Sequence, residues 1–300
     1  MVVGPSMLGR LRIGLAVLAL STASSLAADS PAPKGTIEHV WIPSPAIHHQ
    51  PRSVRVYLPP SYQSPLATTR RYPVIVLLHG WPGGDGNWLG QGRAAETLDT
   101  LIARHGLPEL IALMPNANGP GIHGRSRYLD PTDHSFDIQE FLSRDLVHWA
   151  DSALRTRPDP TQRAVIGLSD GGIGAINLAL RHPEVFGAAG GLSGQYRLGR
   201  VWGEGRILGP EPAATVRRQE GSPWFIVGEH VASLRAQLIF LGCGTSDAML
   251  SDNRAFHARL DSVRVPHTFT EVPGGHNWKV WRRLFPEALR VLTAKMRPIG

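Results

Sequence analysis

The chain has 300 residues, of which 42% are hydrophobic and 18% are charged, and its net charge is +7 at pH 7. This length and composition suit one large domain, or at most two, and exclude a disordered chain rich in charge. The basic residues are scattered and almost all arginine, which argues against a nucleic-acid-binding protein. Cys243 is the only cysteine, so an intrachain disulfide is excluded. Its apolar surroundings favour a buried side chain over a nucleophile.

Residues 1–27 have the three parts of a secretory signal peptide. Arg10 and Arg12 supply the positive charge, residues 13–20 form the apolar run, and Ser25-Leu-Ala27 fits the cleavage pattern. The apolar run is shorter than the roughly 20 residues of a membrane-spanning helix, so no stable membrane span is expected. We therefore expect an exported protein, periplasmic or secreted. A start codon placed too far upstream is the alternative.

After a linker at residues 28–35, strands and helices alternate along residues 36–300, which we expect to form a single domain. The predicted elements, in chain order, are strands at 37–42, 53–58 and 73–79, a helix at 92–105, a strand at 110–114, a helix at 136–154, a strand at 164–168, a helix at 171–181, strands at 185–191 and 237–241, a helix at 253–263, a strand at 268–272 and a helix at 280–296. This alternation predicts an α/β fold with a mostly parallel sheet and helices on both faces. Ligands of such sheets bind beyond the carboxyl ends of the strands.

One of those strand ends carries a serine in a glycine-rich turn. Gly167-Leu-Ser169-Asp-Gly171 stands between the strand at 164–168 and the helix at 171–181. A Gly-x-Ser-x-Gly pattern alone is weak evidence, but a strand–turn–helix context is what a nucleophile elbow requires. We therefore expect Ser169 to be a nucleophile.

A serine that accepts an acyl group needs two donors for the oxyanion. The N–H of Asp170 follows the nucleophile at the start of a helix and is the first expected donor. The glycine-rich loop at 79–84 follows the third strand, and the N–H of Trp81 is the second. His79 precedes the serine, so we expect it to anchor this loop and not to act as the base.

The base and its acid should follow the last two strands. His276 lies just past the strand at 268–272, whereas His267 lies at the opposite end of that strand. A neutral imidazole there can take the serine proton and return it to the leaving group. Asp247 follows the strand at 237–241 and is the expected acid, with Asp252 as the alternative. The competing role for Asp247 is to cap the next helix.

Four motifs in this order resemble one esterase family of α/β-hydrolases, over about residues 36–296. They are His79-Gly80, Gly167-Leu-Ser-Asp-Gly-Gly172, Gly242-Cys-Gly-Thr-Ser-Asp247 and Gly274-Gly-His-Asn-Trp278. The family includes enterochelin esterase, feruloyl esterases, S-formylglutathione hydrolase and the mycolyltransferases. The resemblance implies an α/β-hydrolase fold and carboxylic-ester hydrolysis through an acyl-enzyme. Acyl transfer, as in the mycolyltransferases, or hydrolysis of a siderophore ester are alternatives, and a non-catalytic binding protein is a third reading.

The residue after the nucleophile departs from this family, which usually has methionine where this chain has Asp170. A carboxylate aimed at the oxyanion would oppose its negative charge. The other possibility is that the side chain turns outward at the start of the helix, where the helix dipole favours an acid. We favour the outward orientation.

Aromatic residues near the site suggest the class of substrate. The candidate substrate-binding residues are Tyr128, Tyr196, Trp202, Trp224 and Trp278. Such rings stack on aromatic acyl groups or sugars, but they serve equally often as packing anchors. We expect a small-molecule or carbohydrate-linked ester as substrate. No cofactor and no metal are expected, because the adjacent histidines at 48 and 49 have no carboxylate or cysteine at ligand spacing.

Overall fold

The computed structural model describes residues 1–2, 33–119, 124–199 and 205–300 of the chain. The predicted signal peptide, most of the predicted linker and Trp202 lie outside the described residues. Pro33–Gly300 form one compact unit.

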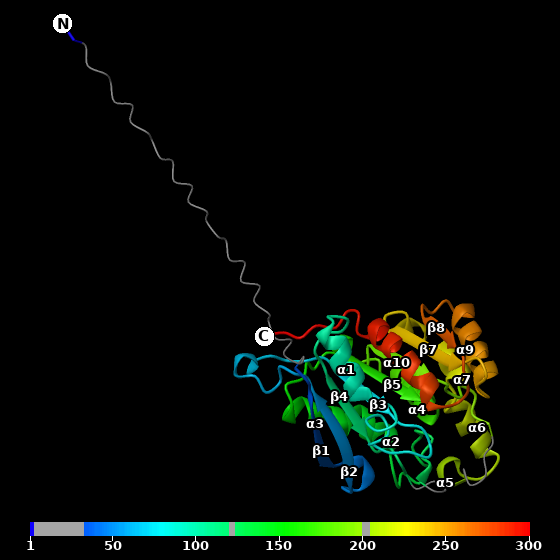
Figure 1. Cartoon of the computed structure of the whole chain (residues 1–300). Coiled ribbons are helices and arrows are strands. Elements are labelled where there is room, and N and C mark those ends of the chain that lie inside the picture. The colour runs from blue at the N-terminus through cyan, green and yellow to red at the C-terminus, as the bar shows by residue number, and fades with distance from the viewer. Residues whose placement is uncertain (3–32, 120–123, 200–204) are drawn as a thin grey trace. The chain divides into compact units, whose positions relative to one another are not determined.

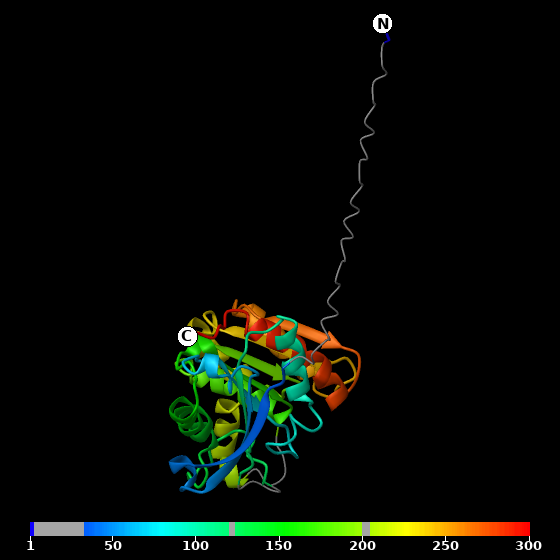
Figure 2. The ribbon, with the colours of Figure 1, turned by 60° about the vertical axis from the view of Figure 1, so that its left-hand side comes forward.

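A central eight-stranded sheet has the strand order β1-β2-β4-β3-β5-β6-β7-β8. The strands are β1 (Thr36–Pro43), β2 (Pro51–Leu58), β3 (Val74–Leu78), β4 (Ile111–Pro115), β5 (Arg163–Leu168), β6 (Ala188–Leu192), β7 (Leu238–Gly244) and β8 (Thr268–Val272). Strands β3 to β8 pair in parallel, while β1 and β2 pair antiparallel with each other and β2 pairs antiparallel with β4. The right-handed twist of the sheet turns the β1–β2 ribbon steeply away from the later strands (Figure 2). The predicted α/β fold with a mostly parallel sheet is confirmed.

Helices cover both faces of this sheet (Figure 1). They are α1 (Ala94–Ala103), α2 (Ile138–Glu140), α3 (Leu146–Ala153), α4 (Asp170–Arg181), α5 (Gly205–Leu208), α6 (Ala213–Glu220), α7 (Pro223–Ile226), α8 (Val231–Leu234), α9 (Leu250–Ser262) and α10 (Trp278–Leu292). Alternate residues of β3 point to opposite faces: Ile75 packs in one core with α1 and α10, and Val76 packs in another with α3, α4 and α9. Among the described residues, no helix is long and apolar enough to cross a membrane.

Several predicted elements differ from the observed ones. The helix predicted at 136–154 consists of α2 and α3, joined by a π-helical turn at Phe141–Asp145. No helix or strand was predicted at residues 193–236, but the described part of this segment contains the short helices α5 to α8. Helices this short show no apolar periodicity along the sequence. Helix α10 begins at Trp278 and not at residue 280, because the Asn277 side chain accepts bonds from the N–H groups of Lys279 and Val280.

Candidate active site

The turn between β5 and α4 holds Ser169 in a strained conformation. Its φ is 55° and its ψ is −121°, a region that residues with side chains rarely adopt. The flanking glycines allow the close approach that this turn requires. A Cβ atom on Gly167 would lie 1.9 Å from the Gly171 carbonyl oxygen, and one on Gly171 would lie 2.5 Å from the Leu78 carbonyl oxygen. The sequence pattern therefore corresponds to a real steric need at this strand-to-helix turn.

Ser169, His276 and Asp247 form a continuous chain of hydrogen bonds. His276 Nε2 lies 2.9 Å from Ser169 Oγ, and His276 Nδ1 lies 3.0 Å from each carboxylate oxygen of Asp247. The Asp247 side chain is fully buried, whereas a third of the His276 side chain is exposed. Since an ionised carboxylate only accepts, Nδ1–H donates to Asp247 and leaves Nε2 to accept the serine proton.

The charge of Asp247 is favoured by its surroundings. Burial opposes ionisation, but hydrogen bonds from the His276 side chain, the Met249 N–H and the Ser193 side chain outweigh it and lower the pKa of Asp247. The Met249 N–H donates to Oδ1 at 2.8 Å. Asp247 thus stays charged at neutral pH. The Asp247 carboxylate can therefore hold the His276 tautomer while it also accepts the Met249 N–H just before α9.

The alternative acid and bases have other partners. Asp252 accepts hydrogen bonds from the backbone N–H groups of Tyr196 and Arg197 and from the Arg197 guanidinium. His79 is buried, donates through Nδ1 to the Gly80 carbonyl and accepts at Nε2 from the Ala117 N–H. Burial lowers the pKa of His79, which favours this neutral form. Asp252 and His79 therefore have structural roles, and His79 anchors the loop after β3 as expected.

The loop after β3 borders Ser169. Trp81 and Gly80 line a cavity of about 310 Å³ together with Ser169 and His276. The remaining lining residues are Pro82, Asn87, Gln91, Leu168, Asn277, Trp278 and Trp281. Asp170 is the first residue of α4, where backbone N–H groups have no acceptor within the helix. This places both segments that were expected to supply oxyanion donors beside Ser169.

The Asp170 carboxylate pairs with Arg125. Its two oxygens accept from Arg125 Nε and Nη2 at 2.6 Å each, and the side chains are 9% and 24% exposed. The guanidinium also stacks over the Trp81 ring, 5.0 Å from its centroid. Asp170 thus has a fixed counter-charge from Arg125, a residue that was not predicted from the sequence to belong to the site. The acid at position 170, directly after Ser169, could have indicated such a partner, because a buried carboxylate requires a counter-charge or hydrogen-bond donors.

Two of the expected substrate contacts belong to the protein interior. The Tyr128 hydroxyl donates to the His79 carbonyl at 2.7 Å, and the side chain is 2% exposed. Tyr196 is fully buried and stacks on Phe256, with 4.4 Å between ring centroids. The prediction that Tyr128 and Tyr196 contact the substrate is therefore wrong, because both rings pack inside the protein.

The remaining aromatic candidates have different surroundings. Trp278 lines the cavity beside Ser169, and so does Trp281, which was not among the candidates predicted from the sequence. Trp281 packs edge-on against His276 at 5.0 Å and donates from Nε1 to Ser193 Oγ. Trp224 does not line this cavity; its ring lies under the guanidinium of Arg197 at 5.2 Å. Trp202 lies outside the described residues.

Cys243 is buried in β7, as expected. Burial is the main cause that raises the pKa of its thiol to about 12. A thiol of this kind stays protonated and is a poor nucleophile.

A nucleophile elbow on a mostly parallel sheet, with an aspartate and a histidine after later strands, defines an α/β-hydrolase. The family model described as "Putative esterase" matches residues 44–292, and the chain belongs to this family. Esterase Rv1288 of Mycobacterium tuberculosis is 28% identical over 82% of this chain and 56% of its own length. The chain thus spans about half the length of the curated relatives it matches first.

Two further comparisons concern feruloyl esterases. The endo-1,4-beta-xylanase/feruloyl esterase of Xylanibacter ruminicola is 33% identical over 48% of this chain and 19% of its own length. The structure of a ferulic acid esterase superposes with a TM-score of 0.78 at 26% identity, covering 87% of this chain and 98% of that one. The expected membership of this esterase family is confirmed.

Proposed function

We propose that this chain is an exported serine hydrolase of carboxylic esters, with Ser169, His276 and Asp247 as its catalytic triad. The observation that carries this proposal is the hydrogen-bond chain from Asp247 through His276 to Ser169 Oγ. Membership of the esterase family supports it. Export rests on the signal-peptide pattern of residues 1–27.

The proposed reaction proceeds through an acyl-enzyme. His276 Nε2 takes the hydroxyl proton as Ser169 Oγ attacks the ester carbonyl, and the N–H groups of Trp81 and Asp170 bind the oxyanion. His276 then gives the proton to the leaving alcohol, and the carbonyl re-forms with the acyl group on Ser169. Water, deprotonated by the same imidazole, then attacks the acyl carbonyl, and His276 returns the proton to Ser169 Oγ as the acid leaves. Each oxyanion donor contributes about 3–4 kcal/mol in the transition state.

We propose a short or aromatic acyl group as the substrate part that enters the cavity. Its volume of about 310 Å³ is at the small end of ligand sites, which span about 300–1,000 Å³. The rings of Trp81, Trp278 and Trp281 line it and offer flat apolar surfaces for an aryl group. Similarity to a ferulic acid esterase supports the same class.

Labelling with a fluorophosphonate tests the nucleophile. We expect one adduct on Ser169 in the purified protein, and none in Ser169→Ala with a comparable melting temperature. No adduct on the folded wild-type protein would refute the enzyme proposal and favour a non-catalytic binding protein. An adduct on another serine would refute only the assignment of Ser169.

An ester panel tests the acyl group separately. We expect a higher kcat/KM for methyl ferulate and p-nitrophenyl acetate or butyrate than for p-nitrophenyl laurate. A strong preference for laurate would refute the proposed acyl group and leave the triad standing. Acyl transfer is measured in the same assay by adding sugar alcohols and comparing transfer products with free acid.

A further inference from the structure

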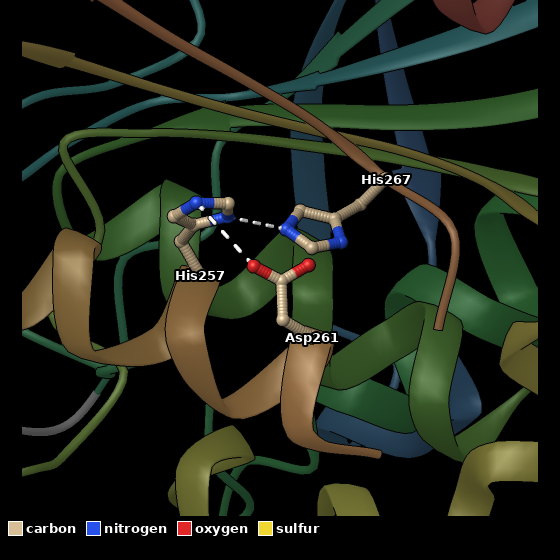
Figure 3. A group of neighbouring side chains, drawn as sticks. All are labelled: His257, Asp261 and His267. Atoms are coloured by element: carbon tan, nitrogen blue, oxygen red, sulfur yellow. Dashed lines mark hydrogen bonds and ion pairs between the residues drawn. The ribbon is translucent and has the colours of Figure 1, made fainter. Parts of the chain in front are cut away.

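Two histidines and an aspartate meet on the surface where α9 precedes β8 (Figure 3). His257 and Asp261 lie one helical turn apart on α9, and His267 lies just before β8. His257 Nδ1 is 2.7 Å from His267 Nε2, and His257 Nε2 is 3.6 Å from an Asp261 carboxylate oxygen. One potential ligand atom from each residue lies within 4.8 Å of the others.

The orientation of His267 is fixed by a backbone contact. Its Nδ1 lies 2.8 Å from the Val265 carbonyl oxygen, so Nδ1 carries the hydrogen and Nε2 has the free lone pair. Metal-binding histidines commonly have this arrangement, in which a carbonyl holds the non-ligating nitrogen. The His257 ring is stacked on Phe269 at 4.8 Å, which limits its rotation.

His257 in turn lies between two acceptors. Its Nδ1 faces the lone pair of His267 Nε2, and its Nε2 faces the Asp261 carboxylate. A neutral imidazole has only one N–H and leaves one of these contacts without a hydrogen. A cation bound by one nitrogen of His257, by Nε2 of His267 and by an Asp261 oxygen removes this conflict, because the other His257 nitrogen then carries the hydrogen.

We propose that His257, Asp261 and His267 form a binding site for one zinc ion, independent of the proposed esterase activity. Two imidazole nitrogens and a carboxylate oxygen are ligands that Zn²⁺ prefers, with water in the fourth position. Tetrahedral ligands at 2.0–2.1 Å lie about 3.3 Å from one another. One potential ligand atom from each residue lies within 4.8 Å of the others, so side-chain rotations bring the three atoms to that spacing. This differs from the expectation, based on sequence, that no metal is bound.

The position of the site indicates stabilisation and not catalysis. His267 precedes β8, whereas His276 follows the opposite, carboxyl end of that strand. An ion held here joins α9, which begins just after Asp247, to β8, which leads to His276. Binding to the folded state alone raises the melting temperature by mass action.

The experiment uses the protein without a histidine tag, stripped with a chelator and dialysed at pH 7.5. Calorimetric titration with ZnCl₂ should show one high-affinity site per chain. The melting temperature should rise by about 5–10 °C when free zinc is roughly 100 times the dissociation constant. His267→Gln and Asp261→Asn should each weaken binding at least tenfold. Asp261 is exposed, so its variant should fold normally.

Two controls separate this site from other histidines. His182→Gln removes a histidine that contacts the single carboxylate of Glu184, and it should bind zinc as the wild type does. His276→Ala removes the proposed catalytic base and should also retain the site. Unchanged binding in both His267→Gln and Asp261→Asn, loss of binding in His276→Ala, or no zinc binding to the wild type would each overturn the proposal.

Discussion

Replacement of Arg125 by methionine tests whether this residue protects the proposed oxyanion from the Asp170 carboxylate. The pair is nearly buried and bidentate, with two contacts of 2.6 Å. Methionine keeps an apolar stem beside Trp81 but removes the charge. The Asp170 carboxylate then remains next to the N–H that is proposed to bind the oxyanion.

The expected effect follows from Coulomb's law. For a separation on the order of 7 Å, an unpaired carboxylate raises the energy of a developing oxyanion by about 2 kcal/mol at an effective dielectric constant of about 20. That energy corresponds to a kcat about 30-fold lower. Asp170→Asn alone should change kcat less than tenfold, because it removes the neutralised carboxylate and leaves the elbow intact. The double variant of Arg125→Met with Asp170→Asn should recover to within about threefold of Asp170→Asn.

The assay is the hydrolysis of p-nitrophenyl acetate, with active sites counted by fluorophosphonate labelling and folding checked by thermal denaturation. Arg197→Met is the matched control, since Arg197 also pairs with an aspartate, Asp252, and lies over a tryptophan ring away from the cavity. Its kcat should equal that of the wild type. A double variant as slow as Arg125→Met would refute the electrostatic reasoning. Arg125 would then act by holding the Trp81 loop in place.

Other expected outcomes concern the triad acid, a buried carboxylate and the elbow. Asp247→Asn should lower kcat by about 10³–10⁴-fold at pH 7 with little change in KM, because the His276 tautomer is lost. The pKa of Asp247 is lower in the folded state than in the unfolded chain, so its charged form stabilises the folded protein at neutral pH. The wild type should therefore melt above Asp247→Asn at pH 7, and this difference in melting temperature should disappear as the pH falls towards 3. Burial is the main cause that raises the pKa of Asp130 to about 6, and the stability that its neutral form contributes is lost as the pH rises through that value. Asp130→Asn should therefore gain stability relative to the wild type as the pH rises from about 4 to about 6.5 in thermal denaturation, with little further change above that range. Gly171→Ala should cost at least about 3 kcal/mol in urea unfolding, because its Cβ would overlap the carbonyl oxygen that ends β3. Gly86→Ala, with no atom within 4 Å of the added Cβ, should stay within about 0.5 kcal/mol.

The features that the sequence predicted well are those encoded locally. Continuous apolar runs mark β3 and β5, and β8 coincides with its predicted range of 268–272. The order of serine, aspartate and histidine after strands placed the three side chains at one sheet edge, where the structure brings them into contact. Parallel pairing makes this possible, because the carboxyl ends of β5, β7 and β8 share that edge.

The features that the sequence did not reveal depend on contacts between distant segments. Tyr196 and Trp278 are both aromatic residues in segments expected to be irregular, yet one is fully buried and the other lines the cavity. Composition does not distinguish these two environments. Tyr196 is buried because its ring stacks on Phe256 of α9, which is distant in the sequence. The proposed zinc ligands were not predicted for the same reason, since His267 comes from a different element from His257 and Asp261.

The Asp170–Arg125 pair shows how the motif around Ser169 can accommodate an acid at the position after the serine. An acid next to the nucleophile would by itself oppose the proposed oxyanion, yet the fold brings a guanidinium from 45 residues away to neutralise it. The same guanidinium lies over Trp81, so one side chain links the helix after the nucleophile to the loop after β3. These two segments carry the two proposed oxyanion donors. Arg125, a residue outside every family motif, therefore offsets the charge of Asp170, and a change at position 125 should affect the reaction without a change in the triad.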